Sequence, residues 1–272
     1  MKKLLQYAIV TSVLILVASS QAKIIVVNTV DNANFNSGVT NLVTAINLLT
    51  NADTISFNIS GSGAHYIVTP VGGYPLVINL SNITINGYSQ PGSSPNTHTI
   101  LSANNANITV FLVSRNGELT DLTGISGYDK EGAVLPILGW TNVDIGGLGF
   151  LGINPGGIAN DGDNMYAIAM GGNTPSQNVH IDGCRFGLDA DNTSVYQFQK
   201  NIVSYGANIV GGYCDIGVSP GSANPRAQFN VFIGGYICTD LEGGANSIFH
   251  VSGNFYDVYP DGLHDFNIDG NT

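Results

Sequence analysis

The sequence predicts an all-β protein, a parallel β-solenoid with one helix near its N-terminus. Three observations lead to this expectation. Only 10% of the 272 residues are charged and 35 are glycine, a composition that suits many tight turns rather than long surface helices. Short apolar runs rich in β-branched residues recur between Gly, Asn and Pro. Two short patterns also repeat, in a constant order, from residue 82 onward.

The first 22 residues form a segment of their own. Two lysines precede an apolar run over residues 4–18, and small residues stand at positions −3 and −1 of a cut before Lys23. This pattern is typical of a secretory signal peptide. A retained membrane anchor is the alternative, but about 15 apolar residues are short for a hydrocarbon core of about 30 Å. We therefore expect residues 1–22 to be removed, leaving a secreted or cell-surface protein with no membrane span.

One helix and several strands are predicted in the first half of the mature chain. The helix is expected over Ser37–Leu49, where apolar residues fall at helical spacing and Ser37 can cap the start. Strands are expected where β-branched runs stand between turn residues. These runs are Ile24–Asn28, Thr54–Ile59, Tyr66–Val68, Leu76–Leu80, Ile83–Ile85, Ile108–Val113 and Val134–Leu138.

The first repeated pattern is Asn-x-x-Ile-x-Gly. Its copies are Asn82–Gly87, Asn142–Gly147, Asn178–Gly183 and Asn230–Gly235, with a degenerate copy at Asn208–Gly212. Strands of stacked coils lie about 4.8 Å apart, so a column of Ile side chains would fill the interior. Gly and Asn would turn the corners because both tolerate positive φ. Stacked Asn side chains could also exchange amide hydrogen bonds along the axis.

The second repeated pattern is a tetrad of an apolar, a small, a variable and a polar residue. Its copies are Leu151–Asn154, Phe186–Asp189, Ile216–Ser219 and Ile237–Asp240. One coil of a solenoid needs roughly two dozen residues, so the longer spacings predict extruded loops within Pro155–Asn164 and Asp191–Gln199. An antiparallel sandwich is the competing architecture, but hairpins do not naturally produce paired repeats in constant order.

One segment of the chain carries a family resemblance. Its matching residues are Asn28-Thr29, Asp31, Leu42–Ile46, Asp53–Gly63, His65, Ile67 and, most strongly, Thr84–Thr97. Together they resemble the N-terminal region of secreted bacterial right-handed parallel β-helix proteins with a CSLREAI-type motif. The resemblance implies a right-handed parallel β-helix of the pectin-lyase-like fold, with the helix capping the first coil. No single activity is established for that family, so the resemblance implies no particular activity here.

The resemblance also suggests how the chain is divided. Residues 23–100 are expected to form the N-terminal cap and first coils, and residues 101–272 the β-helix repeats. The last residues read as another strand with no cap after it, so we expect the repeats to be truncated at the C-terminus. Val43 and Thr44 stand where the family usually has Arg and a polar or acidic residue, so a buried ion pair is not expected there.

Asp182 and Arg185 are the candidate catalytic residues. A β-helix enzyme that cleaves polysaccharides needs clustered carboxylates, with a basic residue or a bound cation to help remove a proton. Arg185 lies next to the strand that carries Asp182 and could face the same side. No phosphate loop, nucleophile elbow or zinc-ligand spacing accompanies them.

Six other polar residues are candidates for binding. The residues that end the four tetrads could form a ladder for sugar hydroxyls or cations, or could simply cap corner N–H groups. They are Asn154, Asp189, Ser219 and Asp240. Asp161 and Asp163 resemble half of a calcium loop but lack the terminal Glu of an EF-hand, so a solvated Gly-Asp turn is the alternative. No cofactor is expected, unless calcium binds at these two residues.

The charge and the aromatic content of the chain limit the classes of partner that it can bind. The formal net charge is −11, and so few Lys and Arg cannot neutralise a run of phosphates, which excludes nucleic acid. The 12 tyrosines could stack on sugar rings from a flat parallel sheet. We therefore predict a secreted or cell-surface module that binds extracellular polysaccharide or a surface protein, or that serves as a structural element. A polysaccharide lyase or glycoside hydrolase is the alternative.

Overall fold

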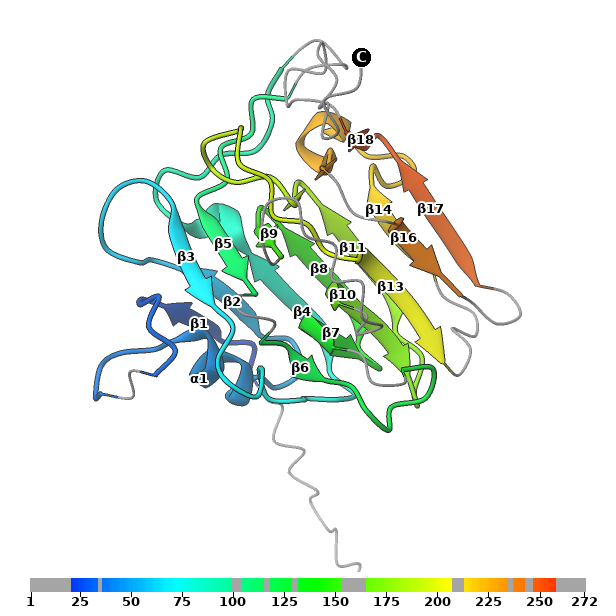
Figure 1. Ribbon diagram of the computed structural model, residues 1–272, viewed down its shortest axis with the longest axis horizontal. Helices are drawn as coiled ribbons and strands as arrows, with labels where there is room; N and C mark the ends of the chain where they lie inside the picture. The colour runs from blue at the N-terminus through cyan, green and yellow to red at the C-terminus, as the bar shows by residue number, and fades with distance from the viewer. Residues whose placement is uncertain are drawn as a thin grey trace, which may run out of the picture.

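The computed structural model describes residues 21–33, 36–98, 104–114, 118–128, 132–152, 165–206, 213–233, 237–242 and 247–257. Over these residues the chain is mostly β, and its strands form three sheets (Figure 1). The signal segment expected over residues 1–22 lies almost wholly outside the described residues. The extruded loop expected within Pro155–Asn164 lies outside them too.

The three sheets, which we call A, B and C, hold seven, six and five strands. In spatial order, sheet A contains β1 (Ile24–Val27), β2 (Thr54–Phe57), β4 (Ser81–Asn86), β8 (Thr141–Gly146), β11 (Gln177–Asp182), β14 (Tyr213–Gly217) and β17 (Ile248–Ser252). Sheet B contains β3 (His65–Val68), β5 (Val110–Val113), β9 (Gly149–Leu151), β12 (Arg185–Phe186), β15 (Val231–Phe232) and β18 (Phe255–Tyr256). Sheet C contains β6 (Thr120–Asp121), β7 (Gly132–Leu138), β10 (Met165–Gly172), β13 (Lys200–Gly206) and β16 (Ile237–Leu241).

The chain visits the sheets in a fixed order. Strands β7, β8 and β9 lie in sheets C, A and B, and each of the next three triplets of strands repeats that order. Each strand pairs in parallel with the strand one round away, whereas the short strand β6 pairs antiparallel with β7. This largely parallel pairing rules out the antiparallel sandwich and agrees with stacked coils.

The predicted column of Ile side chains is confirmed in sheet A. Strand pairing places these residues in one register row, and each side chain is buried. They are Ile25, Ile55, Ile85, Ile145, Ile181 and Ile216. Alternate residues of a strand face opposite sides, so one face of sheet A packs into the core and the other faces outward.

The helix is shorter than predicted. We expected Ser37–Leu49, but α1 spans Leu42–Asn47 and is capped by Asn41, whose side chain accepts a 2.8 Å hydrogen bond from a backbone N–H of the first turn. Gly38 has a φ of 85°, which helical backbone does not allow, so the chain turns there before the helix starts. The helix buries Leu42, Ala45 and Ile46 beside β1, the first strand of sheet A (Figure 1).

The strand predicted over Leu76–Leu80 is wrong. This segment is a loop between β3 and β4, in which Ile78 is 56% exposed. The backbone carbonyl of Val77 in this loop accepts a hydrogen bond of 2.6 Å from the indole N–H of Trp140. The other predicted strands form, with ends that differ by one or more residues.

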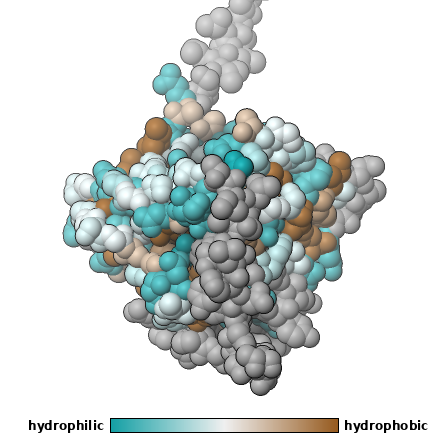
Figure 2. Space-filling model, turned by 90° about the horizontal axis from the view of Figure 1, so that it is seen from above, coloured by the Kyte–Doolittle hydropathy of each residue, from teal (hydrophilic) through white to brown (hydrophobic). Residues whose placement is uncertain are grey.

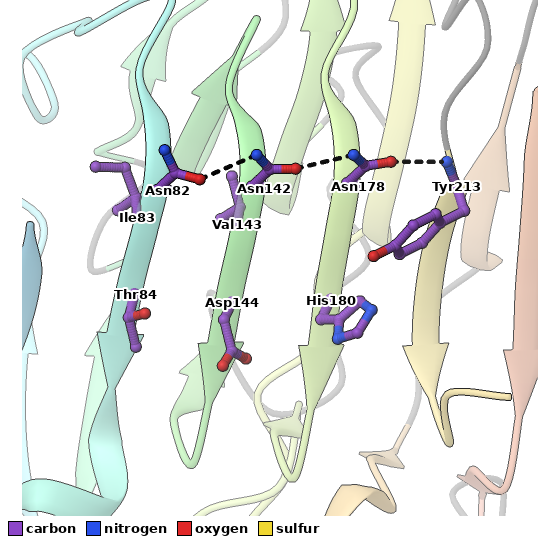
Figure 3. Close-up of a pocket in the computed structure, with 9 residues that line it drawn as sticks. All are labelled: Asn82, Ile83, Thr84, Asn142, Val143, Asp144, Asn178, His180 and Tyr213. Carbon is purple, nitrogen blue, oxygen red and sulfur yellow. Dashed lines mark hydrogen bonds between the residues drawn. The ribbon is translucent and has the colours of Figure 1, made fainter. Parts of the chain in front are cut away.

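The predicted stacking of Asn side chains is confirmed at three positions. Asn82, Asn142 and Asn178 enter sheet A with φ of 59°, 53° and 52°. The Asn142 amide donates to Asn82 Oδ1 at 3.0 Å, and the Asn178 amide donates to Asn142 Oδ1 at 2.8 Å (Figure 3). Tyr213 takes the next position, where its backbone N–H donates to Asn178 Oδ1 at 3.5 Å. The stack therefore runs along the edge where the strands begin.

The fourth predicted copy of the Asn pattern does not belong to this stack. Asn230 precedes β15 in sheet B, where its side chain accepts from the Cys184 N–H at 2.8 Å and donates to the Ile181 carbonyl at 2.8 Å. Its pattern resembles the others because Asn satisfies backbone groups at either corner. The degenerate copy at Asn208–Gly212 lies outside the described residues.

Two substitutions of Asn142 should separate the contribution of its hydrogen bonds from that of its tolerance of positive φ. Asn142→Ala removes both amide hydrogen bonds and places in the left-handed region a residue that tolerates it less well than Asn, so we expect a loss of about 2 kcal/mol in the free energy of unfolding. Asn142→Gly removes the bonds without that strain and should cost about 1 kcal/mol. Urea denaturation measures both variants. Two losses below about 0.3 kcal/mol would show that the stack contributes nothing.

Candidate functional site

The outer face of sheet A carries a row of polar side chains. Strand pairing aligns Thr84, Asp144, His180, Asp215 and His250 on five successive strands, β4, β8, β11, β14 and β17. Each of these residues stands between two residues of the opposite face, most of which are buried and apolar. The row therefore alternates carboxylate and imidazole over its last four strands.

A shallow depression of about 300 Å³ lies on this face (Figure 3). The Asn stack forms one side, and Thr84, Asp144 and His180 form the other. At one end stands Tyr213, whose ring centroid lies 5.5 Å from that of His180. The depression thus combines amides, a carboxylate, an imidazole and one aromatic ring on an open surface.

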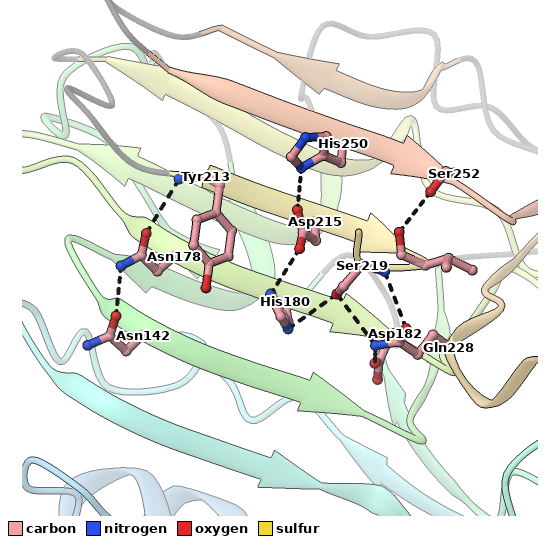
Figure 4. A network of polar contacts seen from close by, with 11 residues as sticks. Asn142, Asn178, His180, Asp182, Tyr213, Asp215, Ser219, Gln228, His250 and Ser252 are labelled. Carbon is pink, nitrogen blue, oxygen red and sulfur yellow. Dashed lines mark hydrogen bonds and ion pairs between the residues drawn. The ribbon is translucent and has the colours of Figure 1, made fainter. Parts of the chain in front are cut away.

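Asp215 is the centre of a network beside the depression (Figure 4). Its carboxylate is 4% exposed and lies between two imidazoles. Oδ2 is 3.0 Å from His180 Nε2, and Oδ1 is 2.7 Å from His250 Nδ1. Burial of a carboxylate costs stability unless it is paired, and here both oxygens have a nitrogen partner. The position of the His180 ring is fixed by this contact.

The network continues to Ser219, which follows β14. Its Oγ lies 3.5 Å from His180 Nδ1, and its backbone N–H donates to Gln228 Oε1 at 3.3 Å. Gln228 Nε2 donates to Asp182 Oδ2 at 2.9 Å and to Ser219 Oγ at 3.4 Å. Three segments of the chain, β11, the end of β14 and the short helix Pro225–Gln228, thus meet at one point.

Two carboxyl groups here hold protons more tightly than usual. Burial, and then the charge of Asp144, raise the pKa of Asp182 to about 6, which the Gln228 hydrogen bond and His180 offset only in part. The pKa of Asp144 is also raised, because neighbouring atoms displace water from an otherwise exposed group. Shifted carboxyl groups at an open depression are a feature of functional sites.

The structure does not bring the predicted pair Asp182 and Arg185 together. Arg185 begins β12 in sheet B and is buried, which lowers its pKa to about 10. Its Nη1 donates to the backbone carbonyl of Asp189 at 3.1 Å and to Asn192 Oδ1 at 2.8 Å. Arg185 therefore braces a turn on another sheet, while Asp182 belongs to the polar face of sheet A.

The predicted ladder of tetrad ends is not formed by the residues that the structure describes. Asp189 follows a strand of sheet B and accepts from the Tyr66 hydroxyl at 2.7 Å. Ser219 follows a strand of sheet A, and Asp240 lies in sheet C, where it pairs with Lys200 at 2.8 Å. The described tetrads therefore belong to three different sheets. Three other predicted site residues, Asn154, Asp161 and Asp163, lie outside the described residues.

Sequence reasoning missed His180, Asp215 and His250 as a set. Each reads only as a polar residue between two apolar ones, which is also the pattern of any half-buried strand. That pattern was a usable signal for an outward-facing row. It did not say which strands become neighbours, because the intervening segments differ in length.

No protein-family model matches the chain, and comparisons with curated proteins and with solved structures found no match. Within the described ranges, no group of three or more His, Cys, Asp or Glu residues is placed to hold a metal ion. No helix in that part of the chain is long and apolar enough to cross a membrane.

Proposed function

We propose that the chain is a right-handed parallel β-helix, secreted or held at the cell surface, that binds neutral polysaccharide along the outer face of sheet A. The repeated order of the three sheets supports the solenoid. Parallel strands joined by crossovers are almost always right-handed, and the resemblance of Asn28–Thr97 points the same way. The signal-like residues 1–22 support export from the cell.

The depression on sheet A is the observation that carries the binding proposal. It presents rows of side-chain amides and hydroxyl, carboxylate and imidazole groups, which match the hydroxyl groups of sugars. The exposed Tyr213 adds a ring on which a sugar can stack. Seen from above, the part of the surface that is not grey carries a mixture of hydrophilic and hydrophobic residues (Figure 2).

The charge of the residues around the depression favours a neutral polysaccharide over an acidic one as the ligand. Among the described residues that line the depression, none is Lys or Arg, whereas Asp144 is one of them. Asp182 and Asp215 add negative charge nearby, and the chain as a whole has a formal net charge of −11. An acidic glycan would be repelled by this surface, and a neutral one would not.

Tyr213→Ala should weaken polysaccharide binding about tenfold, because one sugar–aromatic stacking contact contributes about 1–1.5 kcal/mol. Isothermal titration with a panel of neutral glucans, mannans and xylans, and with acidic pectate as comparison, measures the effect. The matched control is Tyr256→Ala on sheet B, since the two tyrosines are 39% and 41% exposed. Equal affinity of both variants would contradict the proposal, as would preferential binding of pectate.

Hydrolysis of a glycosidic bond is the second candidate. It is favoured by one observation, the pKa of Asp182, which is raised to about 6 and so lies closer to neutral pH, as suits a general acid. A lyase is less well supported because Arg185 is committed to a turn of sheet B. Release of reducing ends from the same panel, abolished in Asp182→Asn, would establish hydrolysis; binding without release would rule it out.

A further inference from the structure

We propose that Ser219, His180 and Asp215 form a triad that hydrolyses carboxylic esters, with Ser219 as nucleophile, His180 as general base and the Asp215 carboxylate orienting His180. The substrates would be O-acylated neutral sugars held in the depression beside His180. The choice of a glycan ester rests on the proposed binding function, whereas the chemistry of the triad does not. Such triads are recognised by geometry and roles on unrelated folds, not by a sequence motif around the serine.

The hydrogen bonds fix the tautomer that a base needs. An ionised carboxylate only accepts, so the 3.0 Å contact with Asp215 Oδ2 requires the proton of neutral His180 to be on Nε2. Nδ1 then carries a lone pair, and it is Nδ1 that faces Ser219 Oγ at 3.5 Å. That distance is long for a hydrogen bond, as is common for catalytic pairs without substrate. His180 is therefore oriented as a general base toward the hydroxyl.

Gln228 leaves the serine proton free to move toward His180. Its Oε1 accepts from the Ser219 N–H, so its Nε2 is the donating end of the amide. Nε2 donates to Ser219 Oγ at 3.4 Å, which leaves the hydroxyl proton to be donated to His180 Nδ1.

The surroundings suit the same reaction. Asp215 is nearly buried and is held on its far oxygen by His250 at 2.7 Å, so the acid of the triad is rigid. The His180 side chain is 31% exposed and lines the depression, so a ligand lying there reaches the base directly. The Asn stack and Tyr213 would hold the sugar while its ester group meets Ser219 (Figure 4).

Water is the only co-reactant that this hydrolysis needs. Ser219 Oγ attacks the ester carbonyl carbon while His180 Nδ1 takes the hydroxyl proton, giving a tetrahedral oxyanion. Collapse breaks the bond to the sugar oxygen, which receives that proton from His180 and leaves as the free hydroxyl. Water then attacks the acyl-serine with His180 again as base. The carboxylic acid is released and Ser219 is regenerated.

The first test is covalent labelling of the full chain with a fluorophosphonate, followed by peptide mass spectrometry. We expect the adduct on Ser219, and its loss in Ser219→Ala and His180→Gln. Ser252→Ala is the matched control, because this exposed serine lies close by and its hydroxyl donates to the Val218 carbonyl. Thermal denaturation verifies that each variant folds. No labelling of Ser219 in the folded wild-type protein would overturn the triad.

The second test follows acetate released from acetylated glucomannan and from p-nitrophenyl acetate. Ser219→Ala should lower kcat about 10³-fold. Asp215→Asn should lower kcat by at least 10²-fold with KM unchanged, since Asp215 is a positioning residue that acts through His180. Turnover of p-nitrophenyl acetate alone would support the triad and overturn the glycan ester as substrate. Turnover without binding of deacetylated glucomannan would support the triad while refuting the proposed binding function.

Discussion

Replacing Phe186 with alanine should lower the free energy of unfolding by about 3–5 kcal/mol. Phe186 is fully buried and lies in the middle of an aromatic column that crosses sheet B. Its ring stacks on Phe150 at 5.0 Å and on Phe232 at 4.6 Å, with interplanar angles of 6° and 5°. Removing the ring leaves a cavity between two coils that the flanking rings cannot close, because each is held by its own strand.

The same column supplies the control. Tyr256 stacks on Phe232 at 5.2 Å but is 41% exposed, so Tyr256→Ala should cost less than about 1 kcal/mol. Guanidinium denaturation followed by fluorescence and by circular dichroism gives both values. Since neighbouring coils stabilise each other, we also expect the two probes to diverge in Phe186→Ala. Equal losses for the two variants would show that the column does not couple the coils.

The parts of the fold that sequence predicts are those with a local physical signal. The Ile column follows from β-branched residues at alternate positions, and the Asn stack follows from a residue that tolerates positive φ just before them. Asn82, Asn142 and Asn178 could be aligned because pattern and conformation agree at all three. That alignment agrees with the neighbouring positions of β4, β8 and β11 in sheet A.

The parts that sequence could not predict depend on which corner of the coil a residue occupies. Phe186, Ile216 and Ile237 begin tetrads that look alike, yet they lie in sheets B, A and C. Small and polar residues suit every corner, so composition does not tell one corner from another. A false alignment of corners produced the ladder of Asp189, Ser219 and Asp240.

The polar network was missed for a related reason. His180 and Asp215 become neighbours only through the register of β11 with β14. The 30 residues between these two strands carry no periodic pattern from which that register could be predicted. Gln228 reaches the site from a short helix that follows β14. Contacts between side chains of neighbouring strands depend on the register of those strands, and a single sequence does not reveal that register when the connecting loops are long.

Asp182→Asn should stabilise the protein at neutral pH, by up to about 3 kcal/mol. Burial and the neighbouring Asp144 raise the pKa of Asp182 from 3.8 to about 6. Well below pH 3.8 the carboxyl is protonated in both the folded and the unfolded chain, so it carries no penalty. Between pH 4 and 6 the unfolded chain ionises it more readily, and above pH 6 the folded chain must hold a desolvated charge. That difference corresponds to about 3 kcal/mol at 1.36 kcal/mol per pH unit.

The amide variant removes the charge and keeps the hydrogen bond, because its side-chain oxygen still accepts from Gln228 Nε2. Urea denaturation at pH 3.0 and pH 7.5 should therefore show nearly equal stability at the lower pH and a clear gain at the higher. Asp121→Asn is the control, since hydrogen bonds from Thr123 lower the pKa of this exposed carboxyl and no gain is expected at either pH. A carboxylate that lowers stability beside an open depression is better explained by function than by folding. The absence of any gain at pH 7.5 would mean that Asp182 is solvated, and would remove the observation that favours glycosidic hydrolysis.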